Sequence, residues 1–328
     1  MTAQRLAADL AGKPAALTEL ADHLARRDPY AALPSLIDDE PANVVLLGMG
    51  ASRHACDAAA ARMRSAGLGA TAEYASAHGS VPGGPDTLVV AVSLGEAQHE
   101  ICAALDRYAG ESAIIVLADG PESPVARYAD VLVPLLAGRE DSGLACRGYQ
   151  HALALLLLLA GRLGAVPAGA SGEVSVTLRR VANASADLLE RADTWVPRAA
   201  ALLKGTAGLH LVAPAERLAS AGQAALAIRR GPVLAAHTCE TGEWSYTDRY
   251  LAAIEDYRAV LFAGSRHDER VAEHLLQLSG SFLAVGGDVD GAAMSLRYLG
   301  DTDPDVSLLT EPLVGELLAA HWWAGRPV

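Results

Sequence analysis

The chain has 328 residues, enough for two domains of ordinary size, and its 51% hydrophobic and 20% charged composition is typical of a globular protein. Its formal net charge of −13, with no compensating lysine and arginine cluster, argues against a nucleic-acid partner. The longest apolar stretch, residues 152–160, is far shorter than the roughly 20 residues that cross a bilayer, and residues 1–27 lack a signal-peptide core, so no membrane partner is expected. Four widely spaced cysteines are typical of reduced structural thiols and predict a cytoplasmic protein.

The first half of the chain alternates predicted strands and helices. A helical pattern over residues 4–27 and a proline-containing linker over 28–41 come first. Strands are then expected at 44–47, 70–74, 88–92, 113–117 and 131–134, with helices at 54–66, 97–109 and 149–163. Such alternation predicts a parallel sheet covered by helices on both faces.

The second half repeats this order of elements at an offset of about 165 residues. A Pro/Gly/Ser-rich break at 166–172 precedes helical patterns at 174–191 and 196–204. The alternation then restarts, with strands at 209–213, 233–237, 259–262 and 282–285 and helices at 218–230, 267–278 and 312–323. We therefore predict an α/β fold of two doubly wound parallel-sheet domains, each a three-layer αβα sandwich. The expected division is an N-terminal helix and linker (1–42), a first domain (43–166) and a second domain with leading helices (167–328).

Two predicted strands of the first half end in small residues and pass directly into helices. Gly48-Met49-Gly50-Ala51-Ser52 follows the first strand, and Ser93-Leu94-Gly95-Glu96 follows the third. Small side chains let backbone N–H groups approach an anion, and a helix N-terminus adds partial positive charge. The first turn lacks the third glycine of the dinucleotide fingerprint, which disfavours a nucleotide cofactor.

The densest polar stretch after a predicted strand runs over residues 237–248. Glu240 and Glu243 are three residues apart there, so they share one face if the chain is helical from residue 241 onward. Two carboxylates in one cleft suit general acid–base chemistry, such as moving a proton through an enediol. The alternative is a helix start whose acidic residues are favoured by the dipole. Histidines and cysteines never fall at metal-ligand spacing, so we expect neither a metal nor a cofactor.

Four segments, in order and spacing, resemble one known family. Residues 10–17 resemble its Gln-Pro-x-x-Leu pattern, and residues 48–52 its Gly-x-Gly-Thr/Ser-Ser turn. Residues 92–97 fall where it has Ser-x-Ser-Gly-Glu-Thr, and residues 141–149 where it has Glu-x-x-Val-Ala-Ser/Thr-Thr-Lys. The chain is thus similar to the double-SIS-domain sugar isomerases, which include the isomerase half of glucosamine-6-phosphate synthase and stand-alone phosphosugar isomerases, deglycases and deaminases. The resemblance implies two flavodoxin-like SIS domains.

The resemblance also implies a substrate site, in which several residues differ from those of the family. The family's phosphate-binding hydroxyl positions are here Val92, Leu94 and Ala97, and each lost hydroxyl removes a hydrogen bond of about 1.5–3 kcal/mol. Backbone N–H groups and helix dipoles remain. The residues implied to bind substrate are Gly50, Ala51, Ser52, Ser93, Leu94, Gly95, Glu96 and Arg147.

Arg147 replaces a family lysine, and it either grips a carboxylate or phosphate or is a solvated arginine at a helix start. Its neighbour Cys146 is either activated by the helix N-terminus or, as we favour, a structural thiol. Farther along, Arg230 falls at the position of the family's base. Glu243 matches a family glutamate, and Tyr246 falls on the ring-opening histidine. The candidates for proton transfer are therefore Glu243, Glu240 and Tyr246.

The resemblance, together with these residues, implies an enzyme that acts on a sugar or amino-sugar derivative, phosphorylated or not, by cofactor-free proton transfer at C1/C2, as an isomerase or deaminase. One alternative is a non-catalytic or repurposed SIS protein that binds a sugar-like ligand. Another is new chemistry on a carboxylate-bearing amino sugar held by Arg147. A homodimer is expected, because the alanine-rich helix at 218–228 and the apolar residues 322–323 need cover and because the family builds its sites at subunit interfaces.

Overall fold

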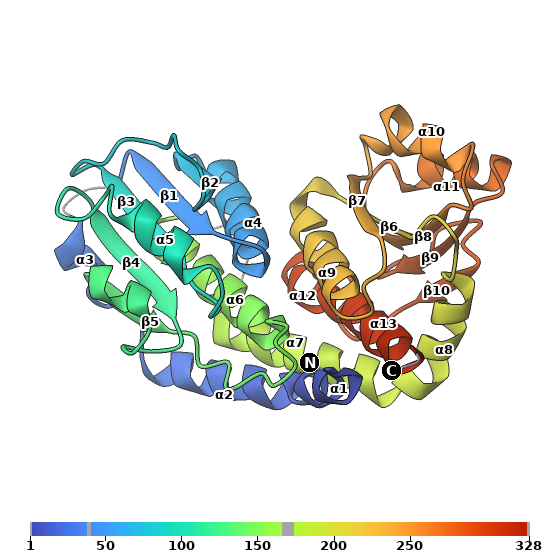
Figure 1. The fold of residues 1–328 in the computed structure, drawn as a ribbon, viewed down its shortest axis with the longest axis horizontal. Helices are drawn as coiled ribbons and strands as arrows, with labels where there is room; N and C mark the ends of the chain where they lie inside the picture. The colour runs from blue at the N-terminus through green and yellow to red at the C-terminus, as the bar shows by residue number, and fades with distance from the viewer. Residues whose placement is uncertain (1, 38–40, 166–173, 327–328) are drawn as a thin grey trace. The chain divides into compact units, whose positions relative to one another are not determined.

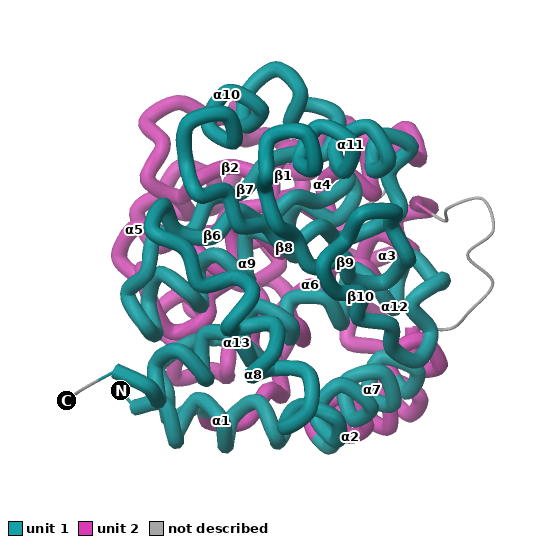
Figure 2. Tube along the Cα trace, turned by 90° about the vertical axis from the view of Figure 1, so that its right-hand side faces the viewer, with its two compact units in different colours: residues 1–15, 140–146, 179–328 teal, residues 16–139, 147–178 magenta. Residues whose placement is uncertain are grey.

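The computed structural model describes residues 2–37, 41–165 and 174–326. The chain divides into two compact units, coloured separately in Figure 2. Unit 1 comprises residues 1–15, 140–146 and 179–328, and unit 2 comprises residues 16–139 and 147–178. The predicted break at 166–172 and the expected domain boundary at 166/167 lie outside the described residues.

Unit 2 is built on a five-stranded parallel sheet in the order β2-β1-β3-β4-β5. Its strands are β1 (Asn43–Gly48), β2 (Ala70–Tyr74), β3 (Thr87–Val92), β4 (Ala113–Ala118) and β5 (Val131–Pro134). Every residue of β3 is buried, because helices cover both faces of a parallel sheet. All five strands occur where the sequence predicted them.

Two helices of unit 2 precede its strands, and its other helices and 3₁₀ turn lie between or after them (Figure 1). They are α2 (Lys13–Arg26, which begins in unit 1), α3 (Leu33–Leu36), α4 (Ala51–Ser65), α5 (Gln98–Leu105), η1 (Pro124–Tyr128) and α6 (Cys146–Arg162, whose first residue belongs to unit 1). Helix α4 packs on β1 and β2. Val45 and Val89 pack with Ile101 and Leu105 of α5 in one core cluster.

Unit 1 repeats the topology, with a parallel sheet in the order β10-β9-β8-β6-β7. Its strands are β6 (Leu209–Ala213), β7 (Ala236–Glu240), β8 (Arg258–Phe262), β9 (Ser281–Val285) and β10 (Met294–Leu296). Two doubly wound α/β sheets confirm the predicted fold class.

The helices of unit 1 include one from the N-terminus of the chain. They are α1 (Ala3–Ala11), α7 (Val174–Glu190, which begins in unit 2), α8 (Ala192–Leu202), α9 (Leu218–Arg230), α10 (Asp248–Ala252), α11 (Asp268–Gln277), α12 (Pro304–Thr310) and α13 (Pro312–Ala324), with turns η2 (Ala215–Arg217) and η3 (Trp244–Tyr246). The predicted helix over 4–27 is two helices, α1 and α2, separated at Gly12.

Helices α9 and α13 pack unusually closely. A Cβ on Gly315 of α13 would lie 2.3 Å from the Cβ of Ala224 in α9, so small residues are needed on both sides. The alanine-rich face of α9 is therefore covered within unit 1, and its composition no longer argues for a partner subunit.

One predicted strand is misplaced. The strand expected at 233–237 begins only at Ala236, because Val233 has a φ of 54° and its side chain is 65% exposed. Left-handed backbone is rare for a β-branched residue, so no sequence pattern marked this turn. Glu240 therefore ends strand β7, where the prediction had it just before a helix.

Candidate functional site

Each sheet has a topological switch point, where the connections from two adjacent strands run to opposite sides of the sheet. In unit 2, β1 lies between β2 and β3, and in unit 1, β6 lies between β7 and β8. Ligands of open α/β sheets bind beyond the carboxyl ends of the strands at such switch points. The turns that follow β1 and β3, and those that follow β6 and β8, are therefore the candidate sites.

The turn after β1 is shaped by two glycines and one serine. A Cβ on Gly48 would lie 2.7 Å from the carbonyl carbon of Ser52, so this position needs glycine. Gly50 has a φ of 55° and caps α4. The buried Ser52 hydroxyl accepts from the Met49 N–H and donates to the Met49 carbonyl, both at 2.9 Å. Ser52 thus stabilises the turn. The groups that the turn can present to a ligand are the first backbone N–H groups of α4, beginning with that of Ala51.

The turn after β3 contains a buried hydroxyl without a partner. Ser93 is 1% exposed, and its Oγ has no hydrogen-bond partner among the described residues. Leu94, Gly95 and Glu96 lead from it to Ala97, which caps α5 in the left-handed region with a φ of 53°. An unsatisfied buried hydroxyl costs about 1–3 kcal/mol, so a ligand or water is needed to pair it.

Arg147 and Cys146 begin helix α6 but have structural contacts. The Arg147 guanidinium donates to the carbonyl of Arg139, in the segment that follows the edge strand β5. Burial raises the pKa of the Cys146 thiol well above its ordinary value, and the nearby Glu316 carboxylate raises it further. An activated thiol is therefore wrong, and Cys146 is structural, as we favoured.

In unit 1 the predicted carboxylates lie around the end of β7. The Glu240 carboxylate accepts the N–H of Glu243 at 2.9 Å. Glu243 precedes the single turn η3 and Tyr246 ends it, and both side chains are exposed. The chain after Glu240 forms a turn before η3, so the shared helix face expected from residue 241 onward is wrong.

His267 joins these carboxylates from the turn after β8. A Cβ on Gly242 would lie 2.9 Å from Glu240 Oε2 and 3.3 Å from His267 Nε2, so the two side chains flank Gly242. Arg266 Nε donates to His267 Nε2 at 3.2 Å. The loops after β7 and β8 thus bring two carboxylates and one imidazole to one edge of this sheet.

A buried network holds this segment against the sheet. The Trp244 indole N–H donates to Tyr257 Oη at 3.0 Å, Tyr257 donates to Asp248 at 2.5 Å, and His210 Nδ1 lies 3.1 Å from the same Asp248 oxygen. Burial raises the pKa of Asp248, but the hydrogen bonds from His210 and Tyr257 outweigh it, so the pKa is lowered overall. Sequence reasoning missed the network; its one signal was a histidine inside the apolar strand β6.

The switch point of unit 1 is occupied by its own side chains. Arg217, after β6, donates to Glu311 and to the Ala263 carbonyl. The buried Asp268 carboxylate accepts the N–H groups of Gly264 at 2.6 Å and Ser265 at 3.0 Å. Burial raises the pKa of Asp268, and it raises that of Glu311 to about 8 although Arg217 opposes the shift. No pattern in the sequence indicated that the Glu311 side chain would contact Arg217.

Residues 36–162 match the family model described as the SIS domain. This part of the chain is a SIS domain. No curated protein matches the chain by sequence.

Several solved structures share the fold of the whole chain. The C-terminal domain of glucosamine-fructose-6-phosphate aminotransferase from Francisella tularensis has a TM-score of 0.80 and 14% identity, covering 98% of this chain and 95% of its own. Tagatose-6-phosphate ketose/aldose isomerase from Escherichia coli has a TM-score of 0.74 and 16% identity, covering 95% and 91%. Glucosamine-6-phosphate deaminase from Thermotoga maritima has a TM-score of 0.71 and 14% identity, covering 99% and 95%. The fold of the double-SIS sugar isomerases, expected from four short motifs, is confirmed.

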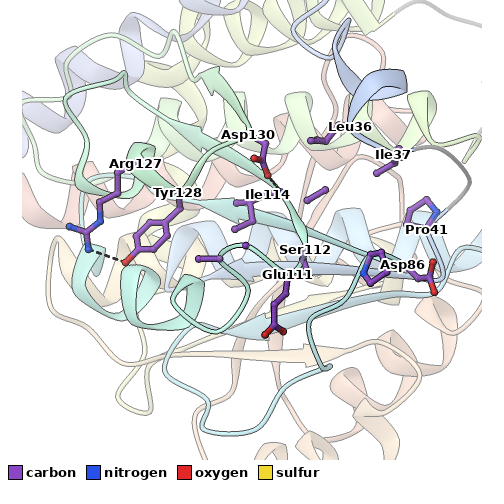
Figure 3. Close-up of a pocket in the computed structure, with 14 residues that line it drawn as sticks. Leu36, Ile37, Pro41, Asp86, Glu111, Ser112, Ile114, Arg127, Tyr128 and Asp130 are labelled. Atoms are coloured by element: carbon purple, nitrogen blue, oxygen red, sulfur yellow. Dashed lines mark hydrogen bonds between the residues drawn. The ribbon is translucent and has the colours of Figure 1, made fainter.

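The SIS domain also has a pocket of about 690 Å³ at the amino ends of its strands (Figure 3). Asp130, one of its lining residues, accepts the N–H of Ile114 at 2.8 Å, and Tyr128 donates to Asp106 at 2.5 Å. These polar groups are satisfied, unlike Ser93 at the carboxyl edge. The SIS-domain switch point is therefore the better candidate site.

The described residues contain neither a candidate membrane span nor a candidate metal site. No helix there is both long and apolar enough to cross a bilayer. No three His, Cys, Asp or Glu side chains within residues 2–37, 41–165 and 174–326 are grouped to hold a metal ion.

Proposed function

We propose that the SIS domain binds a sugar derivative at its switch point, and that the chain moves a proton between C1 and C2 of its substrate without a cofactor. The observation that carries the proposal is the buried Ser93 hydroxyl, which has no partner among the described residues and lies between the ends of β3 and α5. A sugar hydroxyl or an attached anionic group can form hydrogen bonds with such a hydroxyl and with the first N–H groups of α4, which donate.

The names of the structural neighbours suggest hexose phosphates as the substrate class, since two of them are a glucosamine-6-phosphate deaminase and a tagatose-6-phosphate isomerase. The residues present weaken that suggestion. With Val92, Leu94 and Ala97 in the β3 turn, a phosphate would have Ser93 and backbone N–H groups as its partners there.

Glu243 is the candidate base. Its carboxylate is exposed and has no partner in the described part of the chain, whereas the Glu240 carboxylate is hydrogen-bonded to the Glu243 backbone and orients it. In the proposed step, a carboxylate takes the proton from C2 of the open-chain aldose while O1 gains a proton, which forms the enediol. The carboxylate then returns its proton to C1 while O2 loses its proton, which forms the ketose. Tyr246 is exposed beside it and is the candidate to donate to the ring oxygen.

Thermal shift measurements test binding, with hexose and hexosamine 6-phosphates beside their unphosphorylated parents. We expect at least one sugar to stabilise the wild type and to stabilise Ser93→Ala less. Ser65→Ala is the matched control, because Ser65 is exposed and donates only to the Arg62 carbonyl. Absence of any shift would reject the proposal.

Exchange of the C2 proton with D2O, followed by NMR, tests the chemistry on any sugar that binds. We expect exchange with the wild type and at least a 100-fold slower rate with Glu243→Gln, since general base catalysis contributes about 10²–10⁴-fold. Glu269→Gln, at an exposed position in α11, is the control.

A second candidate function is sugar binding without turnover. Arg230, at the position of the family's base, donates instead to the Gly143 carbonyl at 3.1 Å. Ligand stabilisation of the wild type without any C2 exchange would favour this function over isomerisation.

A further inference from the structure

Arg53 lies in the first turn of α4, at the carboxyl edge of the SIS-domain sheet. Its guanidinium carbon is 4.7 Å from the centroid of the Tyr74 ring, and its side chain is only 14% exposed. Tyr74 is the last residue of β2 and pairs in register with Gly48 of β1. The charged group is therefore fixed beside the turn that begins the candidate site.

The guanidinium has a buried donor that the described residues do not satisfy. Asp57, four residues along α4, forms an ion pair with Nη1. Nevertheless, Nε of the same guanidinium is buried without a hydrogen-bond acceptor in the described part of the chain. Buried guanidinium donors are normally paired, so an acceptor is missing here.

The surroundings of this group favour an anion. The helix that carries Arg53 has the positive end of its dipole at the turn after β1, and the unpartnered Ser93 hydroxyl follows β3, on the other side of β1 from Tyr74. Contact with the Tyr74 ring holds the guanidinium plane in place, which reduces the entropy lost on binding. Arg147, the cation suggested by the family resemblance, is instead bonded to the Arg139 carbonyl.

We propose that Arg53 binds an anionic group of the ligand, a carboxylate or a phosphate, and so selects acidic sugars over neutral ones. This inference rests on the proposed function for the ligand's sugar part but not for the anion itself. A planar guanidinium with five N–H donors can donate two parallel hydrogen bonds to either group. The positive charge of Arg53 thus compensates for the anion-binding hydroxyls that the β3 turn lacks.

The molecule contains a matched control at the other end of the same sheet. Arg127 stacks on Tyr128 with its guanidinium carbon 4.9 Å from the ring centroid, and both residues line the pocket at the amino edge (Figure 3). Arg127→Gln removes the same charge and the same kind of stacking as Arg53→Gln. If anions bind in that pocket, Arg127→Gln is the variant that loses them.

The experiment measures dissociation constants by titration calorimetry for glucose 6-phosphate, glucuronate and glucose. Arg53→Gln should weaken binding of the acidic sugar that the wild type prefers by roughly 10-fold or more, leaving glucose unchanged. Arg53→Lys should bind the acidic sugar with an affinity between those of the wild type and Arg53→Gln, since lysine keeps the charge but cannot donate two parallel hydrogen bonds. Asp57→Asn should tighten binding severalfold by removing the competing carboxylate. The melting temperature of each variant without ligand confirms that it folds.

Inorganic phosphate and acetate, without sugar, separate the two proposals. If either anion binds the wild type but not Arg53→Gln, while no sugar binds, the role of Arg53 holds and the proposed sugar function fails. Equal affinity of wild type and Arg53→Gln for every anion, a loss confined to Arg127→Gln, an equal loss for glucose, or no anion binding at all would overturn the role of Arg53.

Discussion

Glu311 shows how a single buried side chain makes folding depend on pH. Burial raises its pKa from 4.5 to about 8, and the neighbouring Arg217 lowers it only in part. The folded chain therefore holds a proton that the unfolded chain releases near pH 4.5. This stabilising contribution is complete below that value and is lost as pH rises through about 8.

Glu311→Gln should flatten this dependence, because an amide keeps the shape and the acceptor for Arg217 but cannot titrate. We expect the melting temperature of the variant to fall less than that of the wild type between about pH 5 and pH 8. Differential scanning calorimetry across this range measures it. Glu269→Gln, exposed on α11, should keep the wild-type profile. Identical profiles for wild type and Glu311→Gln would contradict the assignment.

The contact between α9 and α13 limits the size of the side chains at positions 224 and 315, and no sequence pattern predicts this limit. Because a Cβ on Gly315 would lie 2.3 Å from Ala224 Cβ, Gly315→Ala forces the helices apart. We expect a loss of about 1–3 kcal/mol in the free energy of unfolding, measured in urea. Gly161→Ala in α6 is the control: a Cβ there meets nothing within 4 Å, so helix propensity should raise stability slightly. Equal effects of the two substitutions would refute the packing argument.

The strands show why the fold was predictable from the sequence. Buried parallel strands are short apolar runs bounded by turns, and β2, β5 and β6 occupy the predicted residues. Prediction failed where local pattern and structure diverge. The apolar run near Val233 enters β7 late because its backbone turns left-handed, and β10, of three residues, is too short to leave a pattern.

The candidate site was predictable only in part. Turns of small residues after β1 and β3 are local features, so Gly50 and Ser93 were found from the chain alone. The partners of Arg217 and Asp248 come from segments tens of residues away, and only the folded chain brings them together. Sequence spacing also gave no sign that Arg53 would lie over Tyr74, since that contact joins a helix start to a strand end.

The two units of the molecule share a strand order, but the side chains at their switch points differ. In unit 2 small residues and an unpaired hydroxyl leave the place to a ligand, whereas in unit 1 Arg217 and Glu311 occupy it. One topology therefore supplies both a candidate binding site and a buried contact between Arg217 and Glu311. The repeat fixes where a site can form, and individual side chains decide whether it does.

The two ends of the chain meet inside unit 1 through a buried ion pair. Lys13 Nζ and Glu316 Oε2 are 2.5 Å apart with side chains 1% and 0% exposed, and Gln223 donates to the other carboxylate oxygen at 3.3 Å. Lys13→Met should cost about 3–5 kcal/mol in the free energy of unfolding, because it leaves a buried carboxylate without its cation.

The double variant Lys13→Met/Glu316→Leu should recover most of that loss, since replacing both charges removes the desolvation penalty together with the attraction. Urea unfolding of the wild type, the single variants and the double variant measures the coupling directly. A double variant as unstable as Lys13→Met alone would mean that packing around Lys13, and not its charge, holds the N-terminal segment in unit 1. Recovery would mean that the pair specifies where this segment docks while adding little net stability.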